Sequence, residues 1–123
     1  MDTISIRIPA SPAYLQVVRL IAAGLASRLR FTIDEIEDLK IAVDELSAYL
    51  TGAQGRDGTL EVAFEIDEDV IRIRGRGRFA PGQKIRTDLT DFSKMILQTV
   101  VDSASLEQTN GSPTFELTKS KQK

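Results

Sequence analysis

Two kinds of side chain in this sequence are placed where they can do chemistry, and the first is a pair of carboxylates. Asp44 and Glu45 lie at the centre of a segment whose apolar residues recur at helical spacing. Glu45 falls on the flank of the apolar stripe, where a carboxylate can act as a general base at the edge of a cleft. A solvated helix flank has the same pattern, and the spacing alone favours that simpler interpretation.

The second kind is a row of arginines at every other position, namely Arg72, Arg74, Arg76 and Arg78. Residues two apart in a strand share one face of the sheet, so these guanidinium groups are predicted to lie side by side. They can bind phosphate or an acidic partner, or they can pair with Glu61 and Glu65 on a neighbouring strand. Gly75 and Gly77 interleave with them. Glycines after a strand let a backbone approach phosphate or adenine, although a bent strand needs glycine as well.

The composition excludes several classes of enzyme. The 123 residues include no cysteine and no histidine. Without cysteine there is no disulfide, thiolate nucleophile or cysteine-ligated metal, and without histidine the commonest general base and metal ligand is missing. Histidine-dependent triads, zinc hydrolases and thiol redox enzymes are therefore excluded. Any chemistry must use carboxylates, hydroxyls, amines, guanidinium groups or the backbone.

Charge is distributed unevenly along the chain, although the net charge is only −2. Residues 34–69 contain 12 acids and two bases, whereas residues 72–86 contain six bases and no acid. A local basic strip on an acidic domain indicates either a docking surface or a solvated strand face. The acidic balance argues against general nucleic-acid binding.

The sequence predicts a cytoplasmic protein with no membrane partner. No apolar run approaches the roughly 18 residues that a membrane span requires. The first residues also lack the basic and apolar regions of a signal peptide.

Hydrophobic spacing predicts the elements that would position these residues. Residues 3–9 alternate as a half-buried strand, and residues 12–29 form a helix that opens on a serine and a proline. The core stripe of this helix is predicted to comprise Tyr14, Val18, Ile21, Leu25 and Leu29. A second helix over residues 32–52 begins with a capping box, formed by Thr32 and Glu35.

The second half of the chain begins with two alternating segments, which predict an antiparallel hairpin over residues 60–77. Residues 80–88 come next, and the proline and glycine among them predict a loop. A third helix over about residues 92–101 is predicted to be capped by Asp91 or Ser93.

Two further strands, over residues 103–108 and 114–118, complete the order β-α-α-β-β-α-β-β. Helices that fall between antiparallel strands favour an α+β two-layer sandwich with the three helices on one face of the sheet. The length fits a single domain over residues 1–123, with a charged tail at residues 119–123 that is predicted to fray.

The second predicted helix contains the run Asp38-Leu39-Lys40-Ile41-Ala42-Val43-Asp44-Glu45-Leu46-Ser47-Ala48-Tyr49. This run resembles the N-box helix of the anti-sigma-factor serine kinases, small bacterial regulators of the histidine-kinase-like (GHKL) ATPase superfamily. The order of elements matches from Ile4 to Lys119. The resemblance implies a Bergerat-type fold with a mixed, mainly antiparallel sheet, and a site for ATP and Mg²⁺.

The resemblance also implies partners. They are a sigma factor and an anti-anti-sigma protein, on which a serine would be phosphorylated. Family members commonly dimerise through their sheet, which implies a homodimer. The family's partner-binding arginine of the first helix falls on Arg19, which lies off the apolar stripe. The simpler alternative is an ordinary arginine on a helix surface.

Several catalytic positions of the family are altered in this chain. The glutamate that activates the attacking hydroxyl falls on Glu45, but the Mg²⁺-binding asparagine falls on Tyr49, which is not a usual Mg²⁺ ligand. The adenine-binding aspartate falls on Gly75, which has no side chain to offer. The phosphate cradle falls near Asp91, whose charge would repel phosphate.

Two further positions keep the family's residue type. Gly77 matches a glycine and Thr114 a threonine of the nucleotide site, so both are assigned to a vestigial site. The sequence therefore predicts an anti-sigma factor or a related partner-switching transcription regulator that acts by protein binding. ATP binding is predicted to be lost or weak, so that no cofactor is needed; ATP and Mg²⁺ bind only if the family's site survives. There are two alternatives. One is an active ATP-dependent serine kinase, and the other is a binding module that uses the row from Arg72 to Arg78 for an acidic or nucleic-acid partner.

Overall fold

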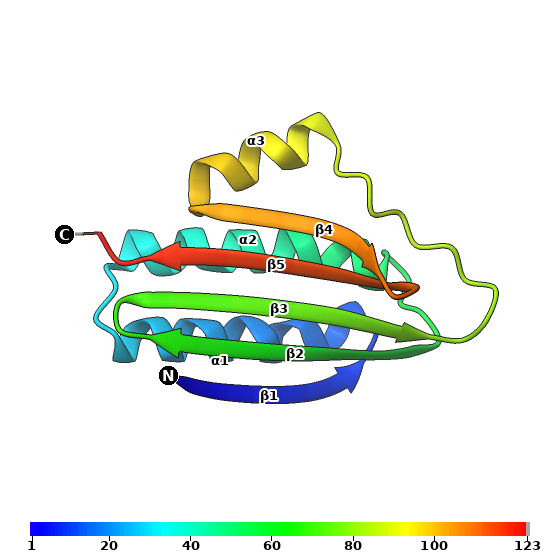
Figure 1. Cartoon of the computed structure of the whole chain (residues 1–123), viewed down its shortest axis with the longest axis horizontal. Helices are drawn as coiled ribbons and strands as arrows, with labels where there is room; N and C mark the ends of the chain where they lie inside the picture. The colour runs from blue at the N-terminus through cyan, green and yellow to red at the C-terminus, as the bar shows by residue number, and fades with distance from the viewer. Residues whose placement is uncertain (123) are drawn as a thin grey trace.

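Five antiparallel strands form one sheet in the computed structural model, which describes residues 1–122 (Figure 1). The order across the sheet is β1-β2-β3-β5-β4. The strands are β1 (Asp2–Pro9), β2 (Gly58–Asp67), β3 (Val70–Phe79), β4 (Ser103–Thr109) and β5 (Ser112–Ser120). The predicted order of elements is confirmed. The sheet is antiparallel at every pairing and not mixed, because hairpins or helix pairs return the chain to the end it left.

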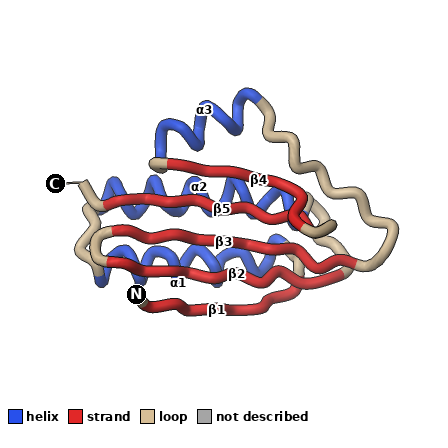
Figure 2. The backbone as a smooth tube through the Cα atoms, viewed as in Figure 1, coloured by secondary structure: helices blue, strands red, loops and turns tan. Residues whose placement is uncertain are grey.

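The helices form the second layer (Figure 2). A single 3₁₀ turn (Pro12–Tyr14) leads into α1 (Leu15–Arg28), and α2 (Ile33–Thr51) runs beside it behind the sheet. The third helix, α3 (Asp91–Val100), packs against α2 and against β4 at the sheet edge. None of the helices formed by residues 1–122 is both long enough and apolar enough to cross a membrane.

The core lies between the two layers. The strands supply it by alternation, since one face of β2 and β3 is apolar and the other carries charge. The largest side chains with no exposed surface come from α2, β2, β3 and β5, and they include Leu39, Leu46, Leu50, Leu60, Phe64, Ile71, Ile73, Phe115 and Leu117.

The start of α2 confirms the predicted capping box. Glu35 N–H donates to Thr32 Oγ1 at 3.1 Å, and Thr32 N–H donates to Glu35 Oε1 at 2.7 Å. The second oxygen of Glu35 accepts from Gln122 N–H at 2.6 Å. The Thr32 backbone N–H lowers the pKa of this buried carboxyl; burial opposes that shift, and the Gln122 N–H adds to it.

Three local predictions are wrong. Tyr14 is exposed, although Val18 of the predicted stripe is buried and Ile21, Leu25 and Leu29 pack partly buried against the core. The buried face of α1 also includes Leu15, Ala22 and Ala26. The N-cap of α3 is Thr90, neither Asp91 nor Ser93. The tail does not fray from Lys119, because β5 continues to Ser120. Lys119 is 5% exposed, and its Nζ donates to the Val100 carbonyl at the end of α3 at 2.7 Å.

Candidate functional site

Glu45 and Tyr49, one turn apart on α2, both contact the first turn of α3. Ser93 is 4% exposed, and its Oγ donates to Glu45 Oε2 at 3.2 Å. The Tyr49 hydroxyl lies 2.8 Å from the same Oγ. The position predicted to act as a base and the position predicted to hold Mg²⁺ are thus bridged by one buried serine of the same chain.

Thr90 completes this group. Its backbone N–H donates to the Tyr49 hydroxyl at 3.0 Å, and its Oγ1 accepts from Ser93 N–H and donates to Ser93 Oγ, both at 3.0 Å. We call Glu45, Tyr49, Thr90 and Ser93 the α2–α3 network. Because the hydroxyls of Tyr49, Thr90 and Ser93 all have partners within the chain, the network ties the two helices together without any ligand.

The same contacts change the acidity of Tyr49. Burial raises the pKa of the phenol, but the hydrogen bonds with Ser93 and Thr90 outweigh burial, and the positive charge of Arg86 acts in the same direction. The net result is a pKa below the ordinary value for tyrosine.

Gly75 and Gly77 lie on the inner face of β3, and aromatic rings cover both. A Cβ atom at Gly75 would overlap the ring of Phe115, which comes from β5. A Cβ atom at Gly77 would overlap the ring of Phe79. The space beside the position predicted to anchor adenine is therefore filled by the protein's own core.

The other predicted site residues do not converge on this region. Asp91 is the exposed first residue of α3. Thr114 is paired with Arg76 in the sheet register, on the face opposite the buried Phe115, and thus away from Gly77. The residues assigned to a vestigial nucleotide site lie on two faces of the sheet.

Arg19 forms an ion pair that its sequence context did not indicate. Its Nε donates to Asp44 Oδ1 at 3.0 Å, which joins α1 to α2. Both side chains are partly exposed, at 34% and 44%, so the pair is accessible from outside. Asp44 was one of the two carboxylates singled out in the sequence, and here it orients the arginine.

Sequence reasoning missed Ser93 and Phe115 as parts of this site. The spacing of Thr90 and Ser93 is a signal that could have found the network, because a threonine three residues before a serine fits a helix cap. The contact between Phe115 and Gly75 has no local signal, since it depends on the pairing of β3 with β5.

Comparisons with known proteins identify the chain's relatives. It is 41% identical over 78 residues to the serine-protein kinase RsbW of Bacillus pumilus, which covers 59% of this chain and 48% of that protein. It is 36% identical over 92 residues to the serine-protein kinase RsbW of Oceanobacillus iheyensis, covering 71% of this chain and 58% of that one. No family model matches the chain. The chain is a relative of the RsbW serine-protein kinases.

The fold agrees with this relationship. A crystal structure of the RsbU and RsbW domains of a Mycobacterium tuberculosis protein superposes with a TM-score of 0.67 at 16% identity, covering 98% of this chain and 32% of that one. The predicted resemblance to the GHKL kinase-like family is confirmed. The chain spans about half the length of the curated RsbW relatives that it matches (48% and 58%).

The residues present in this RsbW relative do not fit a bound Mg-nucleotide. The hydroxyl at the Mg²⁺ position, on Tyr49, is held by Thr90 and Ser93. At Gly75, where the resemblance puts the family's adenine-binding aspartate, the ring of Phe115 leaves no room for a side chain. The arrangement holds α2 against α3, and the hydroxyls of Tyr49, Thr90 and Ser93 are already hydrogen-bonded to one another.

Proposed function

We propose that this chain is a cytoplasmic partner-switching regulator of the anti-sigma kind, which acts by binding proteins and not by Mg-ATP-dependent phosphorylation. The observation that carries the proposal is the α2–α3 network. In it, the Tyr49 hydroxyl is hydrogen-bonded to Ser93 at the position where the resemblance puts the family's Mg²⁺ ligand. A ligand at the Tyr49 hydroxyl would have to break these hydrogen bonds, at a cost of about 1–3 kcal/mol for each polar group left unsatisfied, which weakens nucleotide binding.

The decisive experiment is isothermal titration of the protein with Mg-ATP and with Mg-ADP. We expect no binding up to about 1 mM nucleotide, which corresponds to less than roughly 4 kcal/mol of binding free energy. The RsbW kinase of Bacillus pumilus, titrated under the same conditions, serves as the positive control. Micromolar binding by this chain would overturn the proposal.

An active serine kinase is the second candidate, because the relatives are named serine-protein kinases and Glu45 is retained on the N-box helix. This candidate requires micromolar Mg-ATP binding in the titration above. It also requires transfer of labelled phosphate to an anti-anti-sigma protein, and loss of that transfer in the Glu45→Gln variant.

The partner surface is proposed to include Arg19, as the resemblance implies. A guanidinium already oriented by Asp44 can pair with an incoming carboxylate or carbonyl at little entropic cost. We expect Arg19→Ala to weaken binding of a sigma factor by more than about 1 kcal/mol, roughly fivefold or more in Kd. Titration against the sigma factor that copurifies with the tagged protein from its native host measures this.

The matched control for this prediction is Arg28→Ala, which removes an exposed arginine from the last turn of the same helix. Both variants should unfold at the temperature of the original chain, because exposed ion pairs contribute little to stability. Equal affinities of the Arg19→Ala variant and the original chain would count against the role of Arg19.

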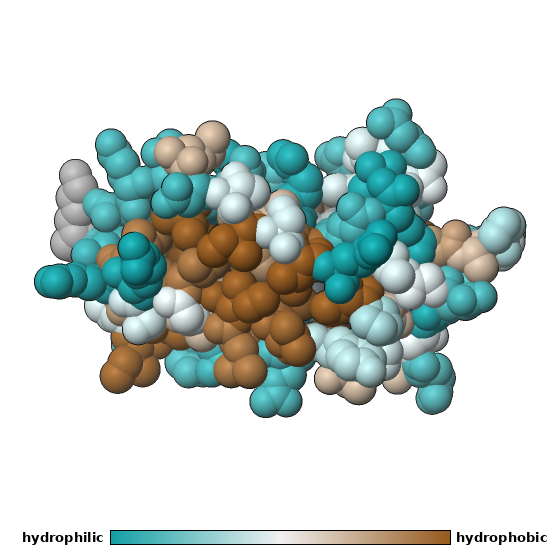
Figure 3. All heavy atoms as spheres, turned by 90° about the horizontal axis from the view of Figure 1, so that it is seen from below, coloured by the Kyte–Doolittle hydropathy of each residue, from teal (hydrophilic) through white to brown (hydrophobic). Residues whose placement is uncertain are grey.

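We also propose a homodimer that uses the sheet edge. Figure 3 shows an apolar region on the β1 side of the molecule. Exposed apolar side chains of β1 and α1 are Ile4, Val17 and Leu20, and β1 is an edge strand of the sheet. Exposed apolar surface next to a free strand edge is typical of an interface.

Sedimentation velocity tests the dimer. We expect two chains per particle at micromolar concentrations, and a monomer for Leu20→Asp, because Leu20 is 62% exposed and its replacement would bury a charge in the interface. Phe92→Asp, which changes an equally exposed residue on α3, should leave the dimer intact. A monomeric original chain would refute the interface.

A further inference from the structure

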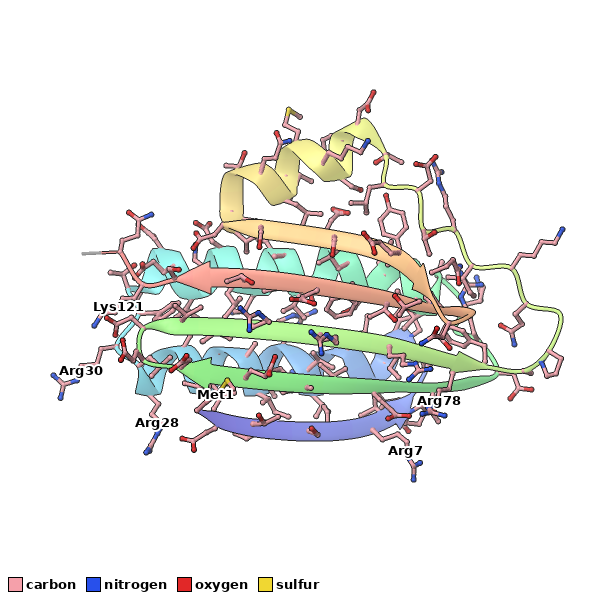
Figure 4. All side chains as sticks on the ribbon, viewed as in Figure 1. Met1, Arg7, Arg28, Arg30, Arg78 and Lys121 are labelled. Carbon is pink, nitrogen blue, oxygen red and sulfur yellow. The ribbon has the colours of Figure 1, made fainter. Side chains whose placement is uncertain are left out.

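The sheet face that the helices leave uncovered carries the row of arginines from β3. Figure 4 presents this face toward the viewer, with the labelled Arg78 at the C-terminal end of β3. Three carboxylates stand on the neighbouring strands of the same face, Glu61 and Glu65 on β2 and Glu116 on β5. Each one lies directly opposite an arginine in the sheet register.

Three of the four arginines are paired with these carboxylates. Arg74 donates from Nε and Nη2 to one oxygen of Glu116, at 3.2 and 3.0 Å. Arg72 lies between two acids, 3.4 Å from Glu116 and 3.9 Å from Glu65. Arg78 pairs with Glu61. The cross-strand pairing considered from the sequence therefore accounts for most of the arginine row.

Arg76 is the exception at the centre of the face. Glu61, directly opposite it in the register, is already paired with Arg78, and on the other side its register partner is Thr114. Within residues 1–122, no carboxylate oxygen lies within 4 Å of the Arg76 guanidinium. Its Nε is shielded from solvent and has no acceptor. A shielded guanidinium N–H without an acceptor is costly, and it shows that no neighbouring side chain satisfies Arg76 as the glutamates satisfy the other three arginines.

Hollows on both sides of Arg76 give access to it. One hollow, of about 470 Å³, extends over β1 and β2 and is floored by the small side chains of Ser5 and Ala63. The other, of about 330 Å³, extends over β5 and β4 and is lined by Ser105 and Thr114. Arg76 lines both, so a side chain that enters either hollow can reach its guanidinium.

We propose that this face binds an acidic segment of a partner protein, with one aspartate or glutamate carboxylate paired to Arg76. A guanidinium and a carboxylate match in shape and charge. The surrounding Glu61, Glu107 and Glu116 would repel a nucleic-acid backbone, which carries a charge at every phosphate. A single carboxylate can pair with Arg76, and Arg7, which lines the same hollow from β1, adds a second positive charge beside it. Serine and threonine hydroxyls lining the hollows can bond the polar groups of an extended segment. This inference does not depend on the proposed sigma-factor function.

The test uses the full chain, labelled with ¹⁵N, and a capped threonine peptide with a single central glutamate. The same peptide with glutamine in place of glutamate is the matched probe, and inorganic phosphate and an oligothymidine of equal charge are the other two. We expect the glutamate peptide to shift backbone signals of β2, β3 and β5. Arg76→Gln should weaken its binding about tenfold. The control variant, Arg28→Gln, should bind as the original chain does.

Each other result overturns the inference. The carboxylate site would be refuted if the glutamate peptide did not bind. It would also be refuted if Arg76→Gln bound that peptide as tightly as the original chain does, or if the glutamine peptide bound as tightly as the glutamate peptide. Phosphate binding as tight as peptide binding would show a simple anion site. Tighter binding of oligothymidine, lost in Arg76→Gln, would assign the face to nucleic acid. Circular dichroism of both variants checks that the sheet is intact.

Discussion

Gly75→Ala is expected to lower the free energy of unfolding by about 3 kcal/mol, at the upper end of the cost of overpacking a core. The added methyl group would overlap the ring of Phe115, and that ring is fully buried between the sheet and the helices. Because interiors are close-packed, the ring can move only by displacing other core side chains. Urea denaturation followed by circular dichroism measures the change.

Two further variants separate overlap from other effects of replacing glycine. Gly24→Ala, on the exposed side of α1 where no atom lies within 4 Å of the new methyl group, should stabilise the protein by about 0.5–1 kcal/mol. Gly75→Ala combined with Phe115→Leu should cost less than the sum of the two single changes, because the smaller side chain leaves room for the methyl group. A cost below about 0.5 kcal/mol for Gly75→Ala alone would mean that Phe115 does not fill this space.

Tyr49→Phe is expected to lower the free energy of unfolding by about 2 kcal/mol. The hydroxyl accepts from Thr90 N–H and contacts Ser93, and its removal leaves Thr90 N–H without its acceptor and takes one hydrogen bond from Ser93. Tyr49→Phe keeps the ring, so a loss of stability reports the hydroxyl alone. The control is Tyr14→Phe, since Tyr14 is exposed and should change stability little. No loss for Tyr49→Phe would show that the α2–α3 network is not a stabilising feature.

The acidity of Tyr49 gives this prediction a pH dependence. Its pKa in the folded protein lies below the ordinary value of tyrosine, about 10, so the ionised form is favoured by folding. The resulting stabilisation is present above pH 10 and is lost as the pH falls through the folded pKa. The stability difference between the original chain and Tyr49→Phe should therefore widen as the pH rises toward 10. Absorbance titration of the phenol should show a component below pH 10 that Tyr49→Phe abolishes.

Local features of this fold could be predicted from the sequence, whereas contacts between distant segments could not. The capping box of Thr32 and Glu35 was predictable, because both residues lie within one helical turn. The ordered Lys119 was not, because the Val100 carbonyl that accepts from it belongs to another element.

The candidate site divides in the same way. Glu45, Tyr49 and Gly75 were singled out by the resemblance of the second helix and the hairpin to the anti-sigma-factor kinases. The partners that explain them, Ser93 and Phe115, lie in segments that only the folded chain brings near. Likewise, the alternation of the arginine row predicted its shared face. Which arginine stays unpaired depends on how neighbouring glutamates lean, and that is a property of the packed surface.

The α2–α3 network also has a consequence for timing. A switch that depends on nucleotide is reset by hydrolysis and so keeps pace with ATP turnover. Two helices that are held together by their own side chains need no nucleotide hydrolysis to keep that contact. Under the proposed function, the fraction of this regulator in each complex follows the concentrations of its partners by mass action. Its response would then be as fast as those partners are made and degraded, and it would be insensitive to the energy charge of the cell.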